Sequence, residues 1–335
     1  FSGLDDAGGC ALVAEPKVTW HVLDTFPGCK HVLAHSLYAR LLGGAAPARG
    51  GLKAGSTVAH LAFYLARHLG CDPIILVGQD LCYSEGLFYP PGTPVERIWQ
   101  PELGRFQTLE MKHWERIVRN RPILKTVRDV NGREAYSDEL LLNYAEQFQA
   151  DFAQTRARVV HAGEAGMPLA GAEVMRLEDA ARQFCTTPLP PDLLRPGVTS
   201  RFEAAAVLAA LRERLAETRQ VRSIGEQLQE LLGRLAGLLD KPREFNRCVA
   251  RVDELRVRIQ QYEAVFRTII DVSPAADLRR HSADRQLGRV EVETVDVARR
   301  RLERDRDFVR AFLDGCAFVE GVLPEAIARA EERLK

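Results

Sequence analysis

The chain has 335 residues, and its 46 basic residues balance its 46 acidic residues, so the formal net charge is zero. This balance argues against a nucleic-acid partner, because binding a phosphate backbone calls for a clustered basic excess. The 46% hydrophobic and 27% charged content is typical of a folded chain rather than a disordered one. No apolar run approaches the roughly 20 residues of a membrane-spanning helix, so no membrane partner is expected.

Seven cysteines are scattered along the chain, and none belongs to a CxxC pair. They offer neither the spacing of a zinc site nor an even-numbered disulfide framework, so no metal site is predicted. Unpaired cysteines and the lack of a visible signal peptide favour a reducing compartment, and we predict a cytoplasmic location.

The first half of the chain is predicted to alternate short strands with helices. Residues 18–23 and 30–34 have the apolar, β-branched composition of strands. Residues 57–69 are predicted to form a helix, since apolar residues recur there at steps of three and four, and Gly70 is typical of a helix end. Residues 74–77 read Ile-Ile-Leu-Val, a continuous apolar run that is typical of a strand buried on both faces of a parallel sheet.

Further along, residues 104–120 have the pattern of a loop followed by a helix, and the Asn-Gly pair at 131–132 signals a turn. Asp138 is expected to cap a helix over residues 139–156. A last short strand is expected at 158–161. This order predicts an α/β fold with a Rossmann-like, mostly parallel sheet.

The second half has a different pattern, from about residue 199 onward. Apolar residues repeat at steps of three and four with charged residues between them, which is the spacing of helix-on-helix packing. The Lys-Pro pair at 241–242 separates a first long helix from a second. A third is expected over residues 285–313, and Leu-Pro at 323–324 begins a last short one. We predict an antiparallel bundle of three or four helices, with a scaffolding or homo-oligomerising role.

The two patterns define two domains. A Pro-rich segment over residues 187–196 is the natural linker between them. We therefore predict an α/β domain over residues 1–190 and an all-helical domain over residues 198–335.

Two short polar stretches stand where a ligand site is expected in such a fold. In open α/β sheets, ligands bind beyond the carboxyl ends of the strands, and Gly78, Gln79 and Asp80 follow the predicted strand at 74–77. A glycine there lets a ligand approach the backbone closely, and the carboxylate of Asp80 can bind a hydroxyl, an amine or a metal. From the residues alone, Asp80 can equally be a cap for the next turn.

The second stretch, Gly55, Ser56 and Thr57, stands at the start of a predicted helix. The free N–H groups and the positive end of the helix dipole at such a position suit a phosphate or a carboxylate. Either hydroxyl can add a donor, or it can serve only as the helix N-cap. Both alternatives stay open from the residues alone.

The order of these two stretches resembles a known family. Residues 55–83 run from the Gly-Ser-Thr turn through an apolar helix ending in Leu-Gly to an apolar strand and Gly-Gln-Asp-Leu-Cys-Tyr. This series resembles the core motif of the motility accessory factors, which are flagellin-modifying glycosyltransferases. The resemblance extends over residues 50–179, through Met-Lys-His-Trp-Glu-Arg at 111–116, Asp-Val-Asn-Gly at 129–132 and His-Ala-Gly-Glu at 161–164.

The same core is similar to bacterial sialyltransferases and to the archaeal-type, MptE-like 6-hydroxymethylpterin diphosphokinase. Motility accessory factors carry a strand followed by Gly-Pro-Ser-Leu upstream of this core, and this sequence has no Gly-Pro-Ser-Leu. We therefore expect an N-terminally truncated member. The family usually has Asp and Thr where this chain has His161 and Gly163, which is a departure at one strand end.

The resemblance implies a bacterial glycosyltransferase. It would move a nonulosonic acid, of the pseudaminic or legionaminic type, from a CMP-sugar to a Ser or Thr of flagellin or another protein acceptor. The resemblance further implies that Ser56 and Thr57 hold the donor's phosphate or carboxylate. Gln79 and Asp80 would line the sugar or ribose, and Tyr83 would bind the leaving phosphate.

Such a reaction needs a general base to take the proton of the acceptor hydroxyl. His161 and His113 are the candidates by residue type, because a neutral imidazole suits this range of pH. Glu164 is expected at a neighbouring strand end. No cofactor is expected beyond the CMP-sugar, which is a substrate.

Two alternatives stay open. As a diphosphokinase acting on 6-hydroxymethyl-dihydropterin, the chain would use ATP or GTP, with Asp80 and Glu164 as oxygen ligands for Mg²⁺. The helical second half is not a feature of that enzyme family, which favours the glycosyltransferase. As a non-catalytic interaction protein, the chain would bind a partner through its helices and keep the α/β core as a relic.

Overall fold

The structure is a computed structural model that describes residues 5–6, 9–46, 51–188, 203–288 and 295–334. It divides into two compact units: residues 1–51 and 196–335 form unit 1, and residues 52–195 form unit 2. Residues 1–51 thus group with the helical second half, whereas the sequence analysis places them in the α/β domain. From residue 189 onward, the predicted Pro-rich linker lies outside the described residues.

Unit 2 contains a parallel sheet in the order β3 (Ile74–Leu76), β6 (Val159–His161) and β7 (Glu173–Val174). Helix α3 (Val58–His68) precedes β3, and helix α6 (Glu139–Ala153) precedes β6 in the same way. Each helix is joined to its strand by a short turn, so a helix–turn–strand arrangement occurs twice in this unit.

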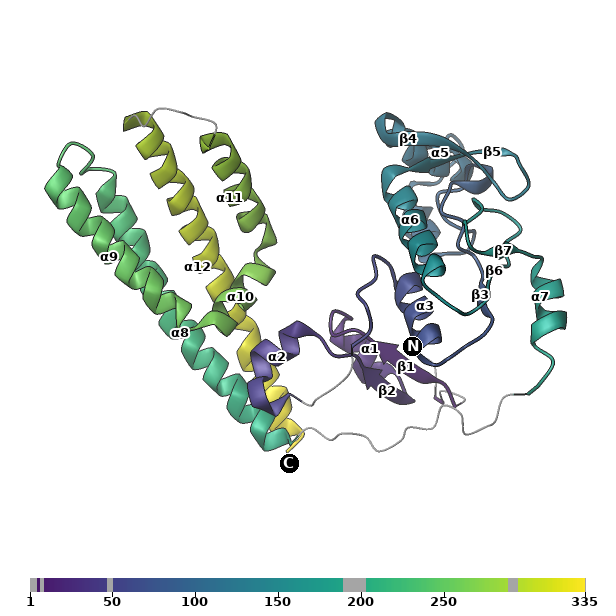
Figure 1. Cartoon of the computed structure of the whole chain (residues 1–335), viewed down its shortest axis with the longest axis horizontal. Helices are drawn as coiled ribbons and strands as arrows, with labels where there is room; N and C mark the ends of the chain where they lie inside the picture. Colours follow the sequence, from purple (N-terminus) through teal and green to yellow (C-terminus); the bar gives the residue numbers. More distant parts are fainter. Residues whose placement is uncertain (1–4, 7–8, 47–50, 189–202, 289–294, 335) are drawn as a thin grey trace. The chain divides into compact units, whose positions relative to one another are not determined.

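Helices cover both faces of this sheet (Figure 1). Aromatic side chains of α3 and α6 pack on one face, in a cluster with Leu76 and Val159. Helix α7 (Leu177–Phe184) covers the other face, on which Val160 lies. Because side chains alternate along a strand, His161 lies on the same face as Val159.

The segment between β3 and α6 forms two further helices and a hairpin. These are α4 (Pro94–Trp99), α5 (Leu109–Arg119), β4 (Leu124–Arg128) and β5 (Glu134–Asp138). The two strands pair antiparallel around the predicted turn at residues 131–132. The sequence predicts this turn but not the strands, because their mixed polar composition gives no strand signal.

Unit 1 begins with two parallel strands, β1 (Ala11–Ala14) and β2 (Cys29–Val32), with helix α1 (Trp20–Thr25) between them. The strand predicted at residues 30–34 overlaps β2, but the strand predicted at 18–23 is wrong. The reason is topological, because parallel strands need a crossover connection, and most of that segment lies in the crossover helix.

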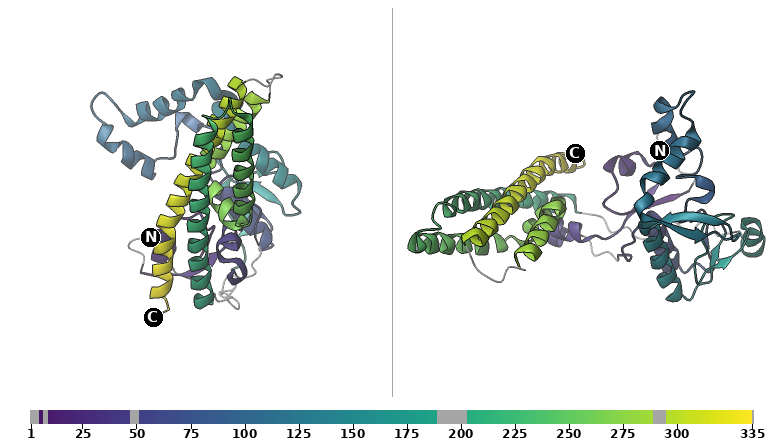
Figure 2. Two further views of the ribbon diagram at one scale, coloured as in Figure 1. Left: turned by 90° about the vertical axis from the view of Figure 1, so that its left-hand side faces the viewer. Right: turned by 90° about the horizontal axis from the view of Figure 1, so that it is seen from above.

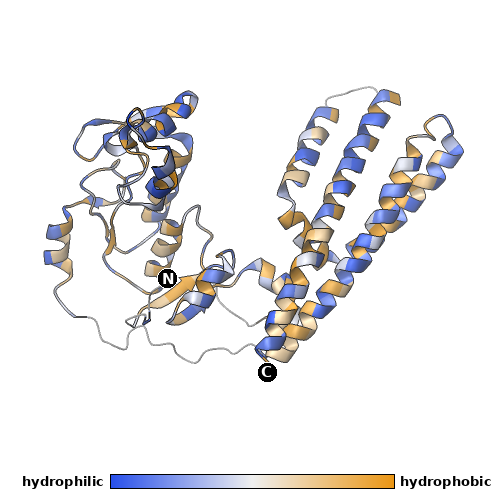
Figure 3. Ribbon diagram, turned by 180° about the vertical axis from the view of Figure 1, so that it is seen from behind, coloured by the Kyte–Doolittle hydropathy of each residue, from blue (hydrophilic) through white to orange (hydrophobic). Residues whose placement is uncertain are grey.

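The other helices of unit 1 pack around two apolar clusters. They are α2 (Ser36–Leu42), α8 (Ala204–Leu235), α9 (Pro242–Gln260), α10 (Glu263–Val272), α11 (Pro274–Leu287) and α12 (Val295–Glu332). Apolar stripes on α8 and α12 face one another along much of their length (Figure 3). Leu42 of α2 joins the cluster that they form.

The helix boundaries test two predictions at prolines. The break at residues 241–242 is confirmed, because Pro242 is the first residue of α9. The last short helix predicted from 323–324 is wrong, because α12 continues through Pro324. Leu323 is buried in the cluster with α8, and this packing outweighs the hydrogen bond that a proline removes from a helix.

The predicted fold class is confirmed as α/β with parallel strands followed by an all-helical region. In the described residues the parallel pairs form two separate short sheets rather than one continuous Rossmann-like sheet. Among these residues, no helix combines the length and the apolar character that crossing a bilayer requires.

Candidate functional site

The carboxyl ends of β3 and β6 lie side by side in unit 2. Leu76, the last residue of β3, is the register partner of His161, the last residue of β6. Gly78 and Asp80 follow the first strand, and Glu164 follows the second. The structure therefore brings together these predicted site residues from segments that are about eighty positions apart.

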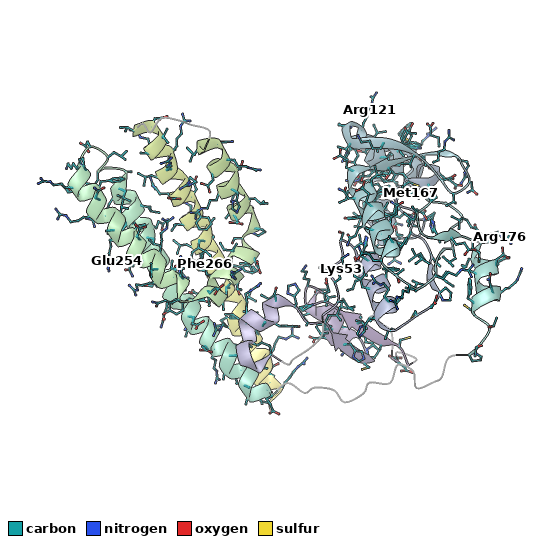
Figure 4. The ribbon with its side chains drawn as sticks, viewed as in Figure 1. Lys53, Arg121, Met167, Arg176, Glu254 and Phe266 are labelled. Atoms are coloured by element: carbon teal, nitrogen blue, oxygen red, sulfur yellow. The ribbon has the colours of Figure 1, made fainter. Side chains whose placement is uncertain are left out.

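Backbone contacts hold three loops together at this edge. The N–H of Met167, labelled in Figure 4, donates to the carbonyl of Asp80 at 2.8 Å. The N–H of Val130 donates to the carbonyl of Gly166 at 2.8 Å, and the side-chain amide of Asn131 donates to the carbonyl of Glu164 at 2.9 Å. The segment at 129–132, recognised in the sequence, thus supports the strand ends.

His161 is the most unusual residue of this edge. Its side chain is fully buried, and neither ring nitrogen has a hydrogen-bond partner in the described part of the chain. Burial lowers its pKa, and the negative charge of Asp80 opposes this shift. A buried polar group without a partner is destabilising and calls for an explanation. Because His161 lies at the strand ends, a bound ligand is one explanation.

Asp80 and Gln79 are half-buried, and Asp80 is close enough to His161 for its charge to act on the imidazole. Within the described ranges, the side chain of Asp80 makes no hydrogen bond, so it does not cap the next turn. Glu164 is exposed. The edge therefore offers a carboxylate and a neutral imidazole, both without protein partners.

The amino end of α3 is different, because its polar groups are already bonded. Thr57 is the N-cap residue, and its hydroxyl accepts from the N–H of His60 at 3.4 Å and lies 2.8 Å from that residue's Nδ1. The hydroxyl of Ser56 is bonded to the side chain of Gln147. A Cβ on Gly55 would lie 2.6 Å from the Cβ of His60, so this turn packs tightly against the helix.

A buried polar network continues from this turn between α3 and α6. Gln147 donates to the Tyr64 hydroxyl at 2.9 Å, which donates to Asp151 at 2.5 Å. The ammonium of Lys53, labelled in Figure 4, lies 2.6 Å from the same carboxylate. Burial alone would raise the pKa of Asp151, but the bonds from Lys53 and Tyr64 outweigh it and lower that pKa. No sequence pattern predicts this network, because its members are far apart in the chain.

His60 is part of the same region and is fully buried. Its ring stacks on Phe148 at 3.8 Å between centroids, and its Nε2 lies 3.2 Å from the carbonyl of Tyr144. Both ring nitrogens therefore have partners. Burial lowers its pKa, against a raising effect of the Tyr144 carbonyl.

Tyr83 and His113 are committed to other contacts. The buried Tyr83 hydroxyl donates to Asp138 at 2.6 Å, and burial together with this bond raises its pKa to about 12. His113 is buried on α5, where its Nδ1 accepts from the N–H of Phe88 at 3.0 Å and its ring meets Trp99 edge-on. Neither has a hydrogen bond to the strand-end residues.

The diphosphokinase alternative would use Asp80 and Glu164 as ligands for Mg²⁺. Within the described ranges, no group of three or more His, Cys, Asp or Glu side chains is arranged to hold a metal ion. The two carboxylates would have to be completed by oxygens of a substrate phosphate.

Part of the chain matches a known protein family. Residues 1–86 match the family model described as 6-hydroxymethylpterin diphosphokinase MptE-like. This match includes residues 55–83 and confirms the resemblance that the sequence predicts there. No curated protein matches the chain.

One solved structure resembles the chain, the MAf glycosyltransferase from Magnetospirillum magneticum AMB-1. The identity is 14% and the TM-score 0.41, over 98% of this chain and 45% of that protein. The chain thus spans less than half the length of that structure. A likeness at this level carries no argument about activity.

Proposed function

We propose that the chain carries the donor site of a glycosyltransferase that moves a nonulosonic acid from a CMP-sugar to a hydroxyl of a protein such as flagellin. The observation that carries the proposal is the pair of adjacent strand ends, where the buried, unpartnered His161 lies beside Asp80. The sequence resemblance over residues 50–179 supplies the substrate class. The scattered free cysteines favour a cytoplasmic setting.

In this proposal, some residues of the strand ends bind the donor and another takes the proton of the acceptor. Gly78 lets the donor approach the backbone, and Asp80 and Gln79 bind hydroxyls of the sugar or ribose. Burial lowers the pKa of His161 and favours its neutral form, and its buried ring would have to become accessible to accept the proton of the acceptor hydroxyl. The acceptor oxygen then forms a bond to the anomeric carbon, and CMP leaves with the electron pair of the broken bond.

Four other predicted residues have weaker claims to these roles. Ser56 and Thr57 are bonded within the protein, and Tyr83 donates to Asp138. Each would have to exchange a protein partner for the donor phosphate. His113 contacts α4, and it could act as the base only if the acceptor hydroxyl bound next to its ring.

The second candidate is an MptE-like diphosphokinase, which the family model over residues 1–86 favours. It would transfer a diphosphate from ATP or GTP with Mg²⁺, and the same strand ends would bind the nucleotide. An interaction protein with a relic core is the third, and it would bind no nucleotide at all.

Ligand-induced changes in the melting temperature separate these functions. The full chain is heated with CMP, CDP, ATP or GTP, each with and without Mg²⁺. A ligand at about 100 times its dissociation constant stabilises the fold by roughly 2.7 kcal/mol. We expect stabilisation by CMP that does not depend on Mg²⁺. A response only to ATP or GTP with Mg²⁺ would select the diphosphokinase, and no response would favour the interaction protein.

Asp80→Ala tests the site itself. Because the carboxylate makes no hydrogen bond within the described part of the chain, its removal should leave the melting temperature nearly unchanged. It should weaken CMP binding about tenfold, the effect of losing a hydrogen bond to a ligand of roughly 1.4 kcal/mol. Glu134→Ala, which removes an exposed carboxylate from β5, is the matched control. Unchanged CMP affinity in the Asp80 variant would place the site elsewhere.

A further inference from the structure

Helix α5 presents apolar side chains on two faces. Ile117 and His113 point inward and are buried. Met111, Trp114 and Val118 are spaced three and four residues apart and therefore share a second face. All three are partly exposed, by 54%, 46% and 54%. The Trp114 ring lies against Gly86, where an added Cβ would come within 2.8 Å of it, so packing within unit 2 covers only part of this stripe.

A tight turn directly before α5 continues this apolar surface. Gly104 and Gln107 exchange two backbone hydrogen bonds, at 3.0 and 3.2 Å, which fix the turn between them. Arg105 and Phe106 form its tip, and the side chain of Phe106 is 87% exposed. Figure 2 shows the blue segment that contains α4 and this turn reaching outward from the teal strands of unit 2. We call Phe106, Met111, Trp114 and Val118 the α5 face.

The segment that contains the α5 face carries an excess of positive charge. Residues 96–128 contain four Glu, whereas their basic residues are Arg97, Arg105, Lys112, Arg116, Arg119, Arg121, Lys125 and Arg128. Two of the Glu are bound to Lys112, and one of these also pairs with Arg119. Arg105 has no acidic partner in the described part of the chain, and neither does Arg121, which is labelled in Figure 4. The chain as a whole is neutral, so this excess is local.

We propose that the α5 face docks on the surface of a lipid bilayer that contains anionic lipids. Trp and Phe side chains favour the boundary between headgroups and acyl chains, and basic residues bind anionic headgroups. The side chain of Phe106 at the tip of the turn is 87% exposed, and a fluid bilayer accommodates such a side chain without a preformed pocket. This proposal departs from the sequence-based expectation of no membrane partner. That expectation was based on the lack of an apolar run long enough to span a bilayer, and docking on the surface needs no such run.

Vesicle flotation with the full chain tests this proposal. The vesicles are phosphatidylcholine alone or phosphatidylcholine with 40% phosphatidylglycerol, in 50 or 300 mM NaCl. We expect binding to the anionic vesicles at low salt, a clear loss at high salt because the charges are screened, and little binding to neutral vesicles. In a Trp20→Phe background, quenching of the exposed Trp114 by brominated lipid should accompany binding.

Variants locate the contact on the α5 face. Phe106→Ser should weaken partitioning roughly tenfold, since its ring no longer leaves water. Arg105→Gln and Arg121→Gln should each weaken it about fivefold. Leu278→Ser and Arg247→Gln, at exposed positions of α11 and α9, are the matched controls and should bind as the unmodified chain does.

Three outcomes overturn the proposal. They are no flotation with anionic vesicles at low salt, equal flotation with neutral vesicles, and flotation that the Phe106 and Arg105 variants leave unchanged. In the first case the α5 face is covered by another part of the protein or by a protein partner. Because these variants lie outside the strand-end site, CMP binding should be normal in all of them, so this test is separate from that of the proposed function.

Discussion

The amino end of α3 and the carboxyl ends of β3 and β6 contain similar polar residues. The two regions differ in whether these side chains have hydrogen-bond partners within the protein. At the helix end, Thr57 and His60 bond to each other, and Ser56 bonds to α6. At the strand ends, the carboxylate of Asp80 and both ring nitrogens of His161 have no hydrogen-bond partner in the described part of the chain. The polar side chains of the first region have their hydrogen-bond partners within the protein. Those of the second can form hydrogen bonds only with a bound ligand.

The presence or absence of protein hydrogen-bond partners indicates which polar region binds a ligand. A buried histidine is not informative by itself, because His60 and His161 are both fully buried and both have a lowered pKa. The partners distinguish them, since one imidazole is satisfied by the protein and the other is not. We infer that stability depends mainly on the first region and ligand binding on the second.

The largest effect is expected at Gly166, where the loops of the strand ends meet. A Cβ there would lie 2.5 Å from the Cα of Asp80, and the glycine has a φ of +95°. Gly166→Ala should lower the free energy of unfolding by about 3 kcal/mol, from backbone strain and overpacking together. Urea denaturation of both proteins measures this change.

Gly132→Ala is the control for that variant. Gly132 has a φ of +78°, but a Cβ on it would meet nothing within 4 Å. Only backbone strain remains, so the loss should be about 1 kcal/mol. Equal losses in the two variants would contradict the close contact between the loops at 80 and 166.

The two buried histidines should respond in opposite ways to the same substitution. His60→Leu removes the bonds to Thr57 and Tyr144 and should lower the free energy of unfolding by about 2 kcal/mol. His161→Leu removes a polar group that has no partner, so stability should stay the same or rise. Transfer of the sugar to the acceptor should be lost only in the His161 variant, because its imidazole is proposed to take the acceptor's proton. Calorimetric unfolding and a transferase assay measure the two properties, and a large loss of stability in His161→Leu would contradict this comparison.

The sequence predicts these elements well where the signal is local. Asp138 caps α6 through a bond to the N–H of Leu141, and Thr57 caps α3, as expected from residue type and position. The strands at 74–77 and 158–161 follow from short apolar runs between polar turns. Such features depend on a few neighbouring residues, which a sequence displays directly.

The sequence predicts poorly which polar groups remain free. Asp80 and Tyr83 are three residues apart, yet the backbone turns at Leu81, which has a φ of +51°. Tyr83 then donates to Asp138 across the hairpin, while Asp80 stays at the strand end. The partner of Tyr83 is 55 positions away, and the Asp80 carboxylate has none in the described part of the chain, so spacing alone could not separate a binding residue from a structural one.

A smaller effect is expected on the pH dependence of stability. The pKa values of His60 and His161 are lowered below the ordinary 6.5 in the folded state, mainly by burial. Below about pH 6.5 the unfolded chain binds protons that the folded chain does not, so the free energy of unfolding falls as the pH falls. One such group contributes at most about 1.4 kcal/mol per pH unit. His161→Leu should therefore make the decrease between pH 7 and 5.5 shallower in urea denaturation. An unaltered decrease would show that its imidazole is protonated in the folded chain.

Thr57→Ala should lower the free energy of unfolding least, and the substitution alters only the amino end of α3. Loss of an N-cap typically lowers the free energy of unfolding by about 1 kcal/mol, and Thr57 also loses its contact with His60. Because its hydroxyl already has protein partners, CMP affinity should not change in a titration of the folded variant. Val58→Ala, at an exposed position of α3, controls for changes in helix propensity. A loss of CMP affinity in Thr57→Ala without a loss in the control would mean that the hydroxyl leaves His60 for the donor phosphate, and the helix end would then belong to the ligand site.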